Sequence, residues 1–396
     1  MTGIGAVTGL GSSVPEMWPK LASGQSGVRY VGDDSLCVPL GATPDYQSIE
    51  KFGSMDACSG FSLLAAEEAV RDAGLSEDAL REMDIVFGTS KGGLRSFERA
   101  SAALRRHGPI GLPPSFLKDF VTNAASDRIA AHLGSMGSRL NFVSACATGT
   151  HSIIMAARRI AAGKSRITLA GSGEASLTPL VVAAFDRMGV LSHRTAEPTT
   201  AMRPYHRRRD GFVIGEGSGA MVLESLESAM ARGARIRAEI RGWALGGEAH
   251  HLSAMDPSGQ SIASRIRYAL DMARTEARDL DYINSHGTAT QQNDVVETRA
   301  FKLALGDNAR NVPISSTKPM TGHLLGATGS VEAVITVLAI QNNFVPPTIN
   351  LDEPDPECDL NYTPNIGVSR SLQTALTLNY GFGGQIAAVV LAKFNA

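Results

Sequence analysis

The sequence predicts a layered α/β fold, and three observations lead to this prediction. The chain has 396 residues, of which 43% are hydrophobic and 19% are charged, so it can bury a large core. Short apolar runs, mostly close to glycines, are typical of buried strands. These runs alternate with stretches whose apolar residues recur every three or four positions, as in helices. Strands and helices that alternate over this length pack as helices on sheets.

The predicted elements follow one another along the whole chain. We expect strands at residues 84–88, 166–171, 220–224, 237–243, 280–284 and 386–392. We expect helices at residues 61–73, 126–133, 151–162, 260–276, 294–305 and 330–341.

A charged stretch at residues 224–235 precedes a new strand, which indicates a boundary near residue 235. We therefore expect two halves, residues 1–235 and 236–396. Residues 144–150 and 321–329 are both turns of small residues that lead into long apolar helices, one in each half. This weak internal similarity agrees with a duplicated fold.

Composition argues against several classes of protein. The formal net charge of −2 gives no basic field for a nucleic acid or an anionic membrane, so neither partner is expected. No segment reaches the roughly 18 uninterrupted apolar residues of a membrane span. The four cysteines, Cys37, Cys58, Cys146 and Cys358, form no C-x-x-C pair, which argues against a zinc site and a disulfide framework. Reduced thiols in a cytoplasm fit this pattern.

Cys146 is the first candidate for chemistry. It follows an apolar run and precedes the helix predicted at 151–162, so the N-terminus of that helix is expected to favour a thiolate. The small residues Ala145, Ala147 and Gly149 leave room for a substrate and for backbone N–H groups to approach it. Taken alone, such a cysteine is more often a buried structural residue.

Two histidines favour a reactive role for Cys146 over a structural one. His286 lies in a turn rich in glycine and threonine, and His323 lies five residues after Lys318 in a second turn. Both positions differ from a histidine on the apolar face of a helix. A metal site that combines these histidines with Asp294 is an alternative, but the sequence has no H-x-x-x-H pair and no carboxylate cluster. We therefore expect no metal.

Seven short motifs occur in order along nearly the whole chain, at residues 2–11, 145–149, 170–174, 209–217, 286–290, 318–326 and 381–384. In this order they resemble the β-ketoacyl-acyl-carrier-protein synthases of the Cys-His-His type, in the thiolase-like superfamily. The resemblance implies a duplicated fold of five layers, α-β-α-β-α, with two mixed sheets.

The resemblance also implies a role for each candidate residue. Cys146 would take an acyl chain from a carrier-protein thioester, which splits the condensation into two steps. His286 and His323 would stabilise the enolate that forms when a malonyl thioester loses carbon dioxide, as neutral donors. Lys318 would support the histidines, with Glu332 as its partner. No cofactor is implied, because the substrates are carried on the phosphopantetheine of an acyl carrier protein.

Further positions follow from the same resemblance. The backbone N–H groups of Cys146 and Phe382 would form the oxyanion hole, and Phe382 would gate the acyl pocket. Thr288 and Thr290 would bind the phosphopantetheine arm, although each could equally be a turn-stabilising threonine. Val121, near an interface between chains, and Phe185 would line the acyl pocket.

The chain departs from the family pattern at a few positions. Gln385 and Ile386 follow the last glycine motif where relatives have Thr-Asn, and His206 replaces an acid, which we interpret as a surface or interface change. These departures favour a specialised synthase of a polyketide, polyene or unusual fatty-acid pathway. Its partners would be an acyl carrier protein and a second chain, as a homodimer or as a heterodimer with a chain-length-factor homologue.

Three other functions fit the sequence less well. A thiolase needs a second active-site cysteine near the C-terminus, and Cys358 lies outside the C-terminal glycine motif. A non-catalytic, chain-length-determining partner subunit would lack Cys146. An initiating synthase would have asparagine in place of His323.

Overall fold

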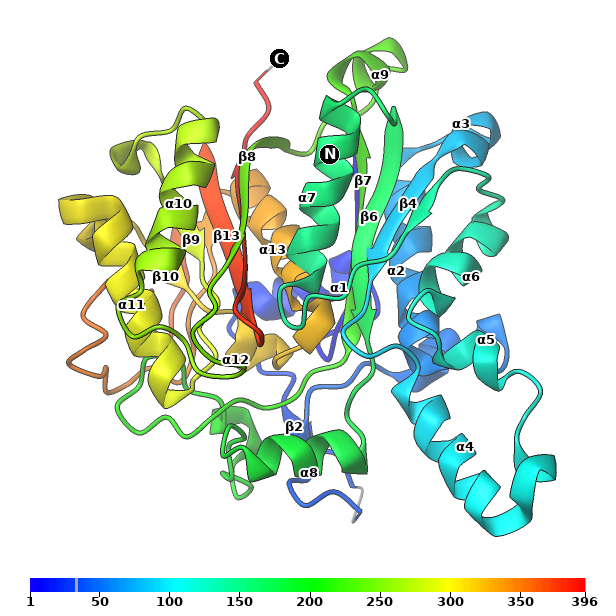
Figure 1. Cartoon of the computed structure of the whole chain (residues 1–396). Helices are drawn as coiled ribbons and strands as arrows, with labels where there is room; N and C mark the ends of the chain where they lie inside the picture. The colour runs from blue at the N-terminus through cyan, green and yellow to red at the C-terminus, as the bar shows by residue number, and fades with distance from the viewer. Residues whose placement is uncertain (33–34, 396) are drawn as a thin grey trace.

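The computed structural model describes residues 1–32 and 35–395, and two five-stranded sheets form the centre of this part (Figure 1). The first sheet has the order β1 (Gly3–Val7), β7 (Gly217–Glu224), β6 (Ile167–Glu174), β4 (Asp84–Gly88) and β5 (Arg139–Leu140). Its first two pairings are antiparallel and its last two are parallel.

The second sheet repeats this arrangement. Its order is β8 (Glu239–Gly247), β14 (Gln385–Ala392), β13 (Thr374–Gly381), β9 (Tyr282–Asn284) and β10 (Ile314–Ser315). The pairings again run antiparallel, antiparallel, parallel and parallel. One sheet is built from residues 3–224 and the other from residues 239–392, so the same topology occurs twice along the chain.

Helices occupy three layers around the two sheets (Figure 1). Between the sheets lie α7 (Thr148–Ala161) and α13 (Thr328–Asn342). The outer face of the first sheet is covered by α2 (Ala57–Ala73) and α6 (Ala124–Leu133), and that of the second sheet by α10 (Gln260–Met272) and α11 (Gln291–Leu305). This is the five-layer α-β-α-β-α fold with two mixed sheets that the resemblance implied.

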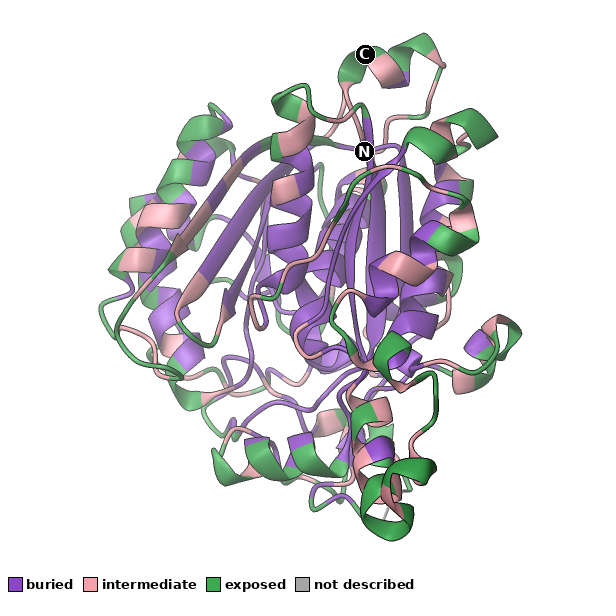
Figure 2. Cartoon of the chain, turned by 45° about the vertical axis from the view of Figure 1, so that its right-hand side comes forward, coloured by how far each residue is buried: buried purple, intermediate pink, exposed green. Residues whose placement is uncertain are grey.

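Burial follows the layers. Figure 2 shows buried strands and central helices, and outer helices with exposed faces turned to solvent. Every residue of α13 from 328 to 340 is buried, as expected for a helix enclosed between two sheets.

The remaining elements lie at the edges and ends of the sheets. The short strand pairs are β2 (Arg29–Tyr30) with β3 (Leu40–Gly41) and β11 (Phe344–Val345) with β12 (Val368–Ser369). The other helices are α1 (Val14–Ala22), α3 (Glu77–Glu82), α4 (Leu94–His107), α5 (Phe116–Phe120), α8 (Pro179–Arg187), α9 (Leu226–Ala231) and α12 (Lys318–Thr321). Among the described residues, no helix has the length and apolar character needed to cross a membrane.

The predicted helices are all present, with different ends. Helix α2 begins at Ala57 instead of residue 61, because the Asp56 carboxylate caps it by accepting a hydrogen bond from Cys58 N. The helix predicted at 260–276 ends at Met272, and Arg274 has a φ of 51°. Left-handed backbone cannot continue an α-helix, so the predicted end at residue 276 was wrong.

Candidate active site

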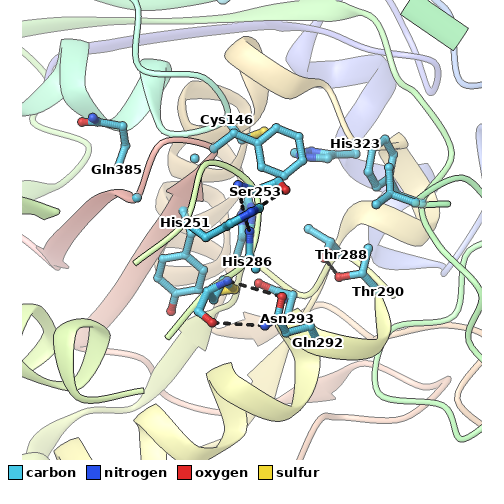
Figure 3. A pocket seen from close by; sticks show the side chains of 18 of the residues that line it. Cys146, His251, Ser253, His286, Thr288, Thr290, Gln292, Asn293, His323 and Gln385 are labelled. Atoms are coloured by element: carbon cyan, nitrogen blue, oxygen red, sulfur yellow. Dashed lines mark hydrogen bonds between the residues drawn. The ribbon is translucent and has the colours of Figure 1, made fainter. Parts of the chain in front are cut away.

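Cys146, His286 and His323 line one cavity of about 270 Å³. Figure 3 shows their side chains together at one end of the cavity, with Thr288 and Thr290 further along its wall. Cys146 and His323 are 177 positions apart in the sequence, and both halves of the chain contribute to the site.

The turn before α7 presents the cysteine. Ala145 has a φ of 47°, a left-handed conformation that is costly for a residue with a side chain. Cys146 follows this strained residue, and α7 begins two positions later at Thr148. Only 9% of Cys146 is exposed. The sharp turn therefore holds the thiol at the N-terminal end of a buried helix.

Burial of Cys146 acts against the thiolate that the helix N-terminus is expected to favour. Burial raises the pKa of the Cys146 thiol to about 11, and the ammonium groups of Lys91 and Lys318 oppose this rise. Desolvation exceeds these favourable charges, because a thiolate loses its hydration in the cavity wall. The thiol is protonated at neutral pH in the free protein, so its proton must leave during acylation.

His286 is held by its backbone as well as by its ring. The N–H groups of His286 and Gly287 donate to the Glu297 carboxylate over 2.7 and 2.8 Å. The imidazole packs edge to face against His323, with 5.4 Å between ring centroids, and against Tyr380 at 5.1 Å. Glu297 thus fixes the turn that follows β9, and burial raises the pKa of its carboxyl to about 7.

His323 lies between α12 and α13. Its backbone N–H donates to Val213 O over 2.8 Å, and its Nδ1 lies 2.9 Å from the Thr328 hydroxyl. Burial lowers the pKa of both His286 and His323 well below the usual value, and the Lys318 ammonium lowers both further. Both imidazoles are therefore neutral at neutral pH.

Lys318 and Glu332 form a fully buried ion pair, with 2.6 Å between Nζ and Oε1. The other Glu332 oxygen accepts a hydrogen bond of 2.7 Å from Asn379 Nδ2. Burial raises the pKa of the Glu332 carboxyl, and Lys318 and Asn379 act against that rise. A carboxylate in this position is stabilised only because both oxygens have partners.

Asn379 was not identified from the sequence. Its Nδ2 also lies 3.4 Å from His286 Nδ1, and its Oδ1 accepts a hydrogen bond from the Thr150 hydroxyl on α7. One amide therefore joins the ion pair, an imidazole and the helix that follows the cysteine. The available signal was a polar residue within the apolar strand just before the glycine motif at 381–384.

The last glycine motif reaches the cysteine from the second sheet. A Cβ on Gly381 would lie 2.6 Å from Ser144 O and 3.2 Å from Cys146 N, so only glycine allows this approach. Phe382 follows and is 38% exposed in the cavity wall, 6.3 Å from the ring of Phe185. This geometry brings the Cys146 and Phe382 backbone together, as an oxyanion hole built from the two would require.

Most of the other predicted positions surround the same cavity. Thr288 and Thr290 line it, and their hydroxyls are 2.9 Å apart. Phe185 lines it as well. Val121 does not, because it lies exposed after α5. The expectation of Val121 in the acyl pocket is thus not met within a single chain.

The departures from the family pattern lie in different environments. Ile386 is buried and Gln385 is partly buried in the cavity wall. His206 is 1% exposed and accepts a hydrogen bond from Arg208 N, so it is not a surface residue of the single chain, and a change at an interface stays a prediction. His206 lies in a loop, and its imidazole stands where the family pattern has an acidic side chain. Within the described chain, no group of three or more His, Cys, Asp or Glu residues could hold a metal ion.

A cavity that presents a cysteine and two neutral imidazoles, on a duplicated two-sheet fold, defines a condensing enzyme of the thiolase-like class. The chain belongs to the β-ketoacyl synthase family and is an acyltransferase of the 3-oxoacyl-acyl-carrier-protein synthase type. The model of the β-ketoacyl synthase N-terminal domain matches residues 1–229, and that of the C-terminal domain matches residues 237–352.

Curated relatives match over their full length. The 3-oxoacyl-[acyl-carrier-protein] synthase 2 of Synechocystis sp. is 40% identical over 408 aligned residues, which cover 100% of this chain and 98% of the relative. The protein of the same name from Coxiella burnetii is 37% identical, with 99% and 98% covered.

Solved structures give the same result. The ishigamide ketosynthase/chain length factor has a TM-score of 0.93 at 32% identity, with 100% of this chain and 98% of that chain covered. A type II PKS acyl-carrier protein in complex with its ketosynthase, bound to the hexaketide, gives a TM-score of 0.92 at 34% identity, with the same coverage.

Proposed function

We propose that this enzyme catalyses a decarboxylative Claisen condensation between an acyl group on Cys146 and a malonyl group on an acyl carrier protein. The observation that carries this proposal is the single cavity that Cys146 shares with two buried, neutral imidazoles. The pathway is one of fatty-acid, polyketide or polyene biosynthesis. Reduced cysteines support a cytoplasmic location.

In the first step, the Cys146 sulfur attacks the acyl thioester and the carrier thiol leaves with the proton of Cys146. The backbone N–H groups of Cys146 and Phe382 stabilise the negative oxygen of the tetrahedral intermediate. Because burial raises the pKa of the Cys146 thiol to about 11, proton loss is coupled to the attack. The neighbouring Lys318 and Lys91 charges favour the developing thiolate.

In the second step, the malonyl thioester loses carbon dioxide and leaves an enolate. His286 and His323 donate hydrogen bonds to the thioester oxygen as its charge grows, which requires neutral imidazoles with a proton to donate. The enolate carbon attacks the acyl-cysteine, a carbon-carbon bond forms, and the Cys146 thiolate leaves and takes up a proton. Thr288 and Thr290 hold the phosphopantetheine arm.

Two partners follow from the proposal. An acyl carrier protein delivers both substrates, and a second chain completes the assembly as a homodimer or as a heterodimer with a chain-length-factor homologue. The names of the structural relatives support both partners. The alternative, a non-catalytic chain-length-determining subunit, has no use for a cysteine at position 146.

The test is intact-protein mass spectrometry after incubation with acyl- and malonyl-carrier protein. We expect acyl mass on wild type, none on Cys146→Ala, and carbon dioxide release. We expect His286→Ala and His323→Asn to retain acylation and to lose condensation by 100-fold or more, roughly the effect of removing an oxyanion donor. Equal acyl mass on Cys146→Ala would refute the proposal.

A further inference from the structure

Lys91 places a second ammonium group beside the cavity. Its Nζ lies 5.7 Å from the centroid of the Phe185 ring, and Phe185 lines the cavity together with Cys146. Phe185 also contacts Phe382, so the ammonium lies next to the aromatic side chains that an acyl chain on Cys146 would meet. The charge acts on both reactive groups: it opposes the raised pKa of Cys146 and contributes to the lowered pKa of His323.

The loop that carries Lys91 is fixed by its neighbours. The Thr89 hydroxyl accepts a hydrogen bond of 3.2 Å from Gly92 N, and a Cβ on Gly93 would lie 1.8 Å from Asp119 O. Ser90 donates from both its N–H and its hydroxyl to the buried carboxylate of Glu174. The backbone therefore has little freedom, and the Lys91 side chain extends from a rigid support.

The ammonium itself is incompletely satisfied. It donates one hydrogen bond of 2.7 Å, to the Ser90 hydroxyl, and within residues 1–32 and 35–395 it forms no ion pair. Glu174 is the nearby acid, but its oxygens are occupied by Ser90, Ser176 and Gly326. Since an ammonium has three donors, two are available to solvent or to a ligand.

The free energy needed to remove water from the Lys91 ammonium depends on which acyl chain occupies the cavity. A hydrocarbon chain against Phe185 would remove water from the ammonium and offer no acceptor in return. A keto, hydroxyl or carboxylate oxygen on the chain would replace that water. A hydrogen bond to a charged group is stronger than one between neutral groups, so we expect the oxygen to change the rate by about tenfold.

We propose that Lys91 makes this synthase selective for acyl chains that carry an oxygen function over hydrocarbon chains of the same length. The proposal rests on the acyl-cysteine function proposed above and specifies its substrate class. Lys91 acts as a specificity residue beside the acyl pocket, next to Phe185, and takes no part in bond formation.

The experiment measures acylation of Cys146 with hexanoyl, 3-oxohexanoyl and 5-oxohexanoyl pantetheine thioesters, followed by intact-protein mass spectrometry. We expect wild type to favour at least one oxo chain over hexanoyl by about tenfold in kcat/KM. We expect Lys91→Met to bring this ratio to about one or below, and Lys91→Arg to keep it above one. Lys164→Met, at an exposed lysine on another face, is the matched control and retains the wild-type ratio.

Each other outcome overturns the proposal in a recognisable way. A wild-type ratio of one or less, for both oxo chains over hexanoyl, would show that the enzyme has no such selectivity. A Lys91→Met variant that slows all three thioesters equally would show that Lys91 acts on the thiol and not on the acyl chain. If no thioester labels Cys146, the acyl-cysteine function itself fails and the selectivity fails with it.

Discussion

The buried Lys318–Glu332 pair sets the electrostatic environment of both imidazoles. The ammonium lowers the pKa of His286 and of His323 in addition to burial, while Glu332 gives Lys318 a buried ion-pair partner. Removal of one member of such a pair leaves an uncompensated buried charge, at a cost of about 3–5 kcal/mol. The pair therefore keeps the histidines neutral without touching the cavity.

Asn379 connects that pair to the chemistry, which leads to a specific prediction. Its two amide hydrogens face Glu332 Oε2 and His286 Nδ1, so the proton of His286 is on Nε2. Asn379→Ala removes this preference. We expect condensation to fall about 10- to 100-fold, the usual range for a residue that orients a reactive histidine, with Cys146 acylation within about threefold of wild type.

The tautomer of His286 provides the independent readout. Nitrogen NMR of the imidazole should show mainly Nε2–H in wild type and a mixture in Asn379→Ala. Thr377→Val is the control, since Thr377 is two residues earlier on the same strand and its buried hydroxyl has no hydrogen-bond partner in the structure. Unchanged condensation in Asn379→Ala would contradict the positioning role.

Acid should destabilise the protein through His286. Its folded pKa lies well below 6.5 and its unfolded pKa is near 6.5, so the unfolded chain binds the extra proton first as pH falls. The free energy of unfolding should therefore decrease below pH 6.5, by at most about 1.4 kcal/mol per pH unit for this group, and should be constant in this respect above it.

Denaturant unfolding at pH 7.5, 6.5 and 5.5 tests this, in wild type and in His286→Asn. The variant should lose less stability between pH 6.5 and 5.5. Parallel curves for the two proteins would mean that burial of His286 does not favour its neutral form.

The sequence identified the reactive residues, which lie within motifs, but not the residues whose hydrogen bonds and charges support them. Cys146, His286 and His323 lie in turns of small residues, a local pattern that can be read along the chain. Asn379, Glu297 and Lys91 gain their importance from partners that lie 10 or more positions away, such as Thr150 for Asn379. The sequence around a buried polar residue in a strand does not indicate which distant residue is its hydrogen-bond partner.

At the scale of elements, the approach of the two central helices depends on glycine. A Cβ on Gly149 of α7 would lie 2.4 Å from Ser330 N of α13 and 2.6 Å from Ser172 Oγ of β6. Since atoms at that distance must move, α7 and α13 would separate, and the ends that carry the site would shift with them.

The sign of one substitution tests this packing. In an unconstrained helix interior, Gly→Ala stabilises by about 1 kcal/mol. We expect Gly149→Ala to destabilise the protein by about 1–3 kcal/mol, the usual cost of overpacking, measured by denaturant unfolding. Ala161→Gly on the exposed last residue of the same helix should cost less than about 1 kcal/mol. A stabilised Gly149→Ala would show that the helices are not in close contact there.

At the scale of the whole molecule, alternation of strand and helix was enough to predict a layered α/β fold. It could not predict the strand orders, because β1 pairs with β7 and β8 pairs with β14 over separations of more than 130 residues. Nor could it predict α4 and α5, which lie away from both sheets at the lower right of Figure 1. Their side chains are mostly outside the core of the single chain, since Ala100 and Asp119 are their only buried residues.

That same segment carries the last prediction. Between residues 94 and 121, Phe97, Leu104, Ile110, Leu117 and Val121 are exposed, with Ile110 at 93% and Leu117 at 67%. Exposed apolar side chains gathered in one segment mark an interface. The occupant we expect is a second chain of this fold, which would also cover Val121.

We therefore expect a two-chain mass for the isolated protein in sedimentation equilibrium at about 10 μM, and a single-chain mass for the double variant Ile110→Asp, Leu117→Asp. Charges at these positions would have to be buried without partners on association, which costs several kcal/mol each. Ile366→Asp is the control, because Ile366 is equally apolar, 78% exposed and outside this segment, so the two-chain mass should persist. A double variant that still sediments as two chains would place the interface on another surface and leave Val121 without a cover.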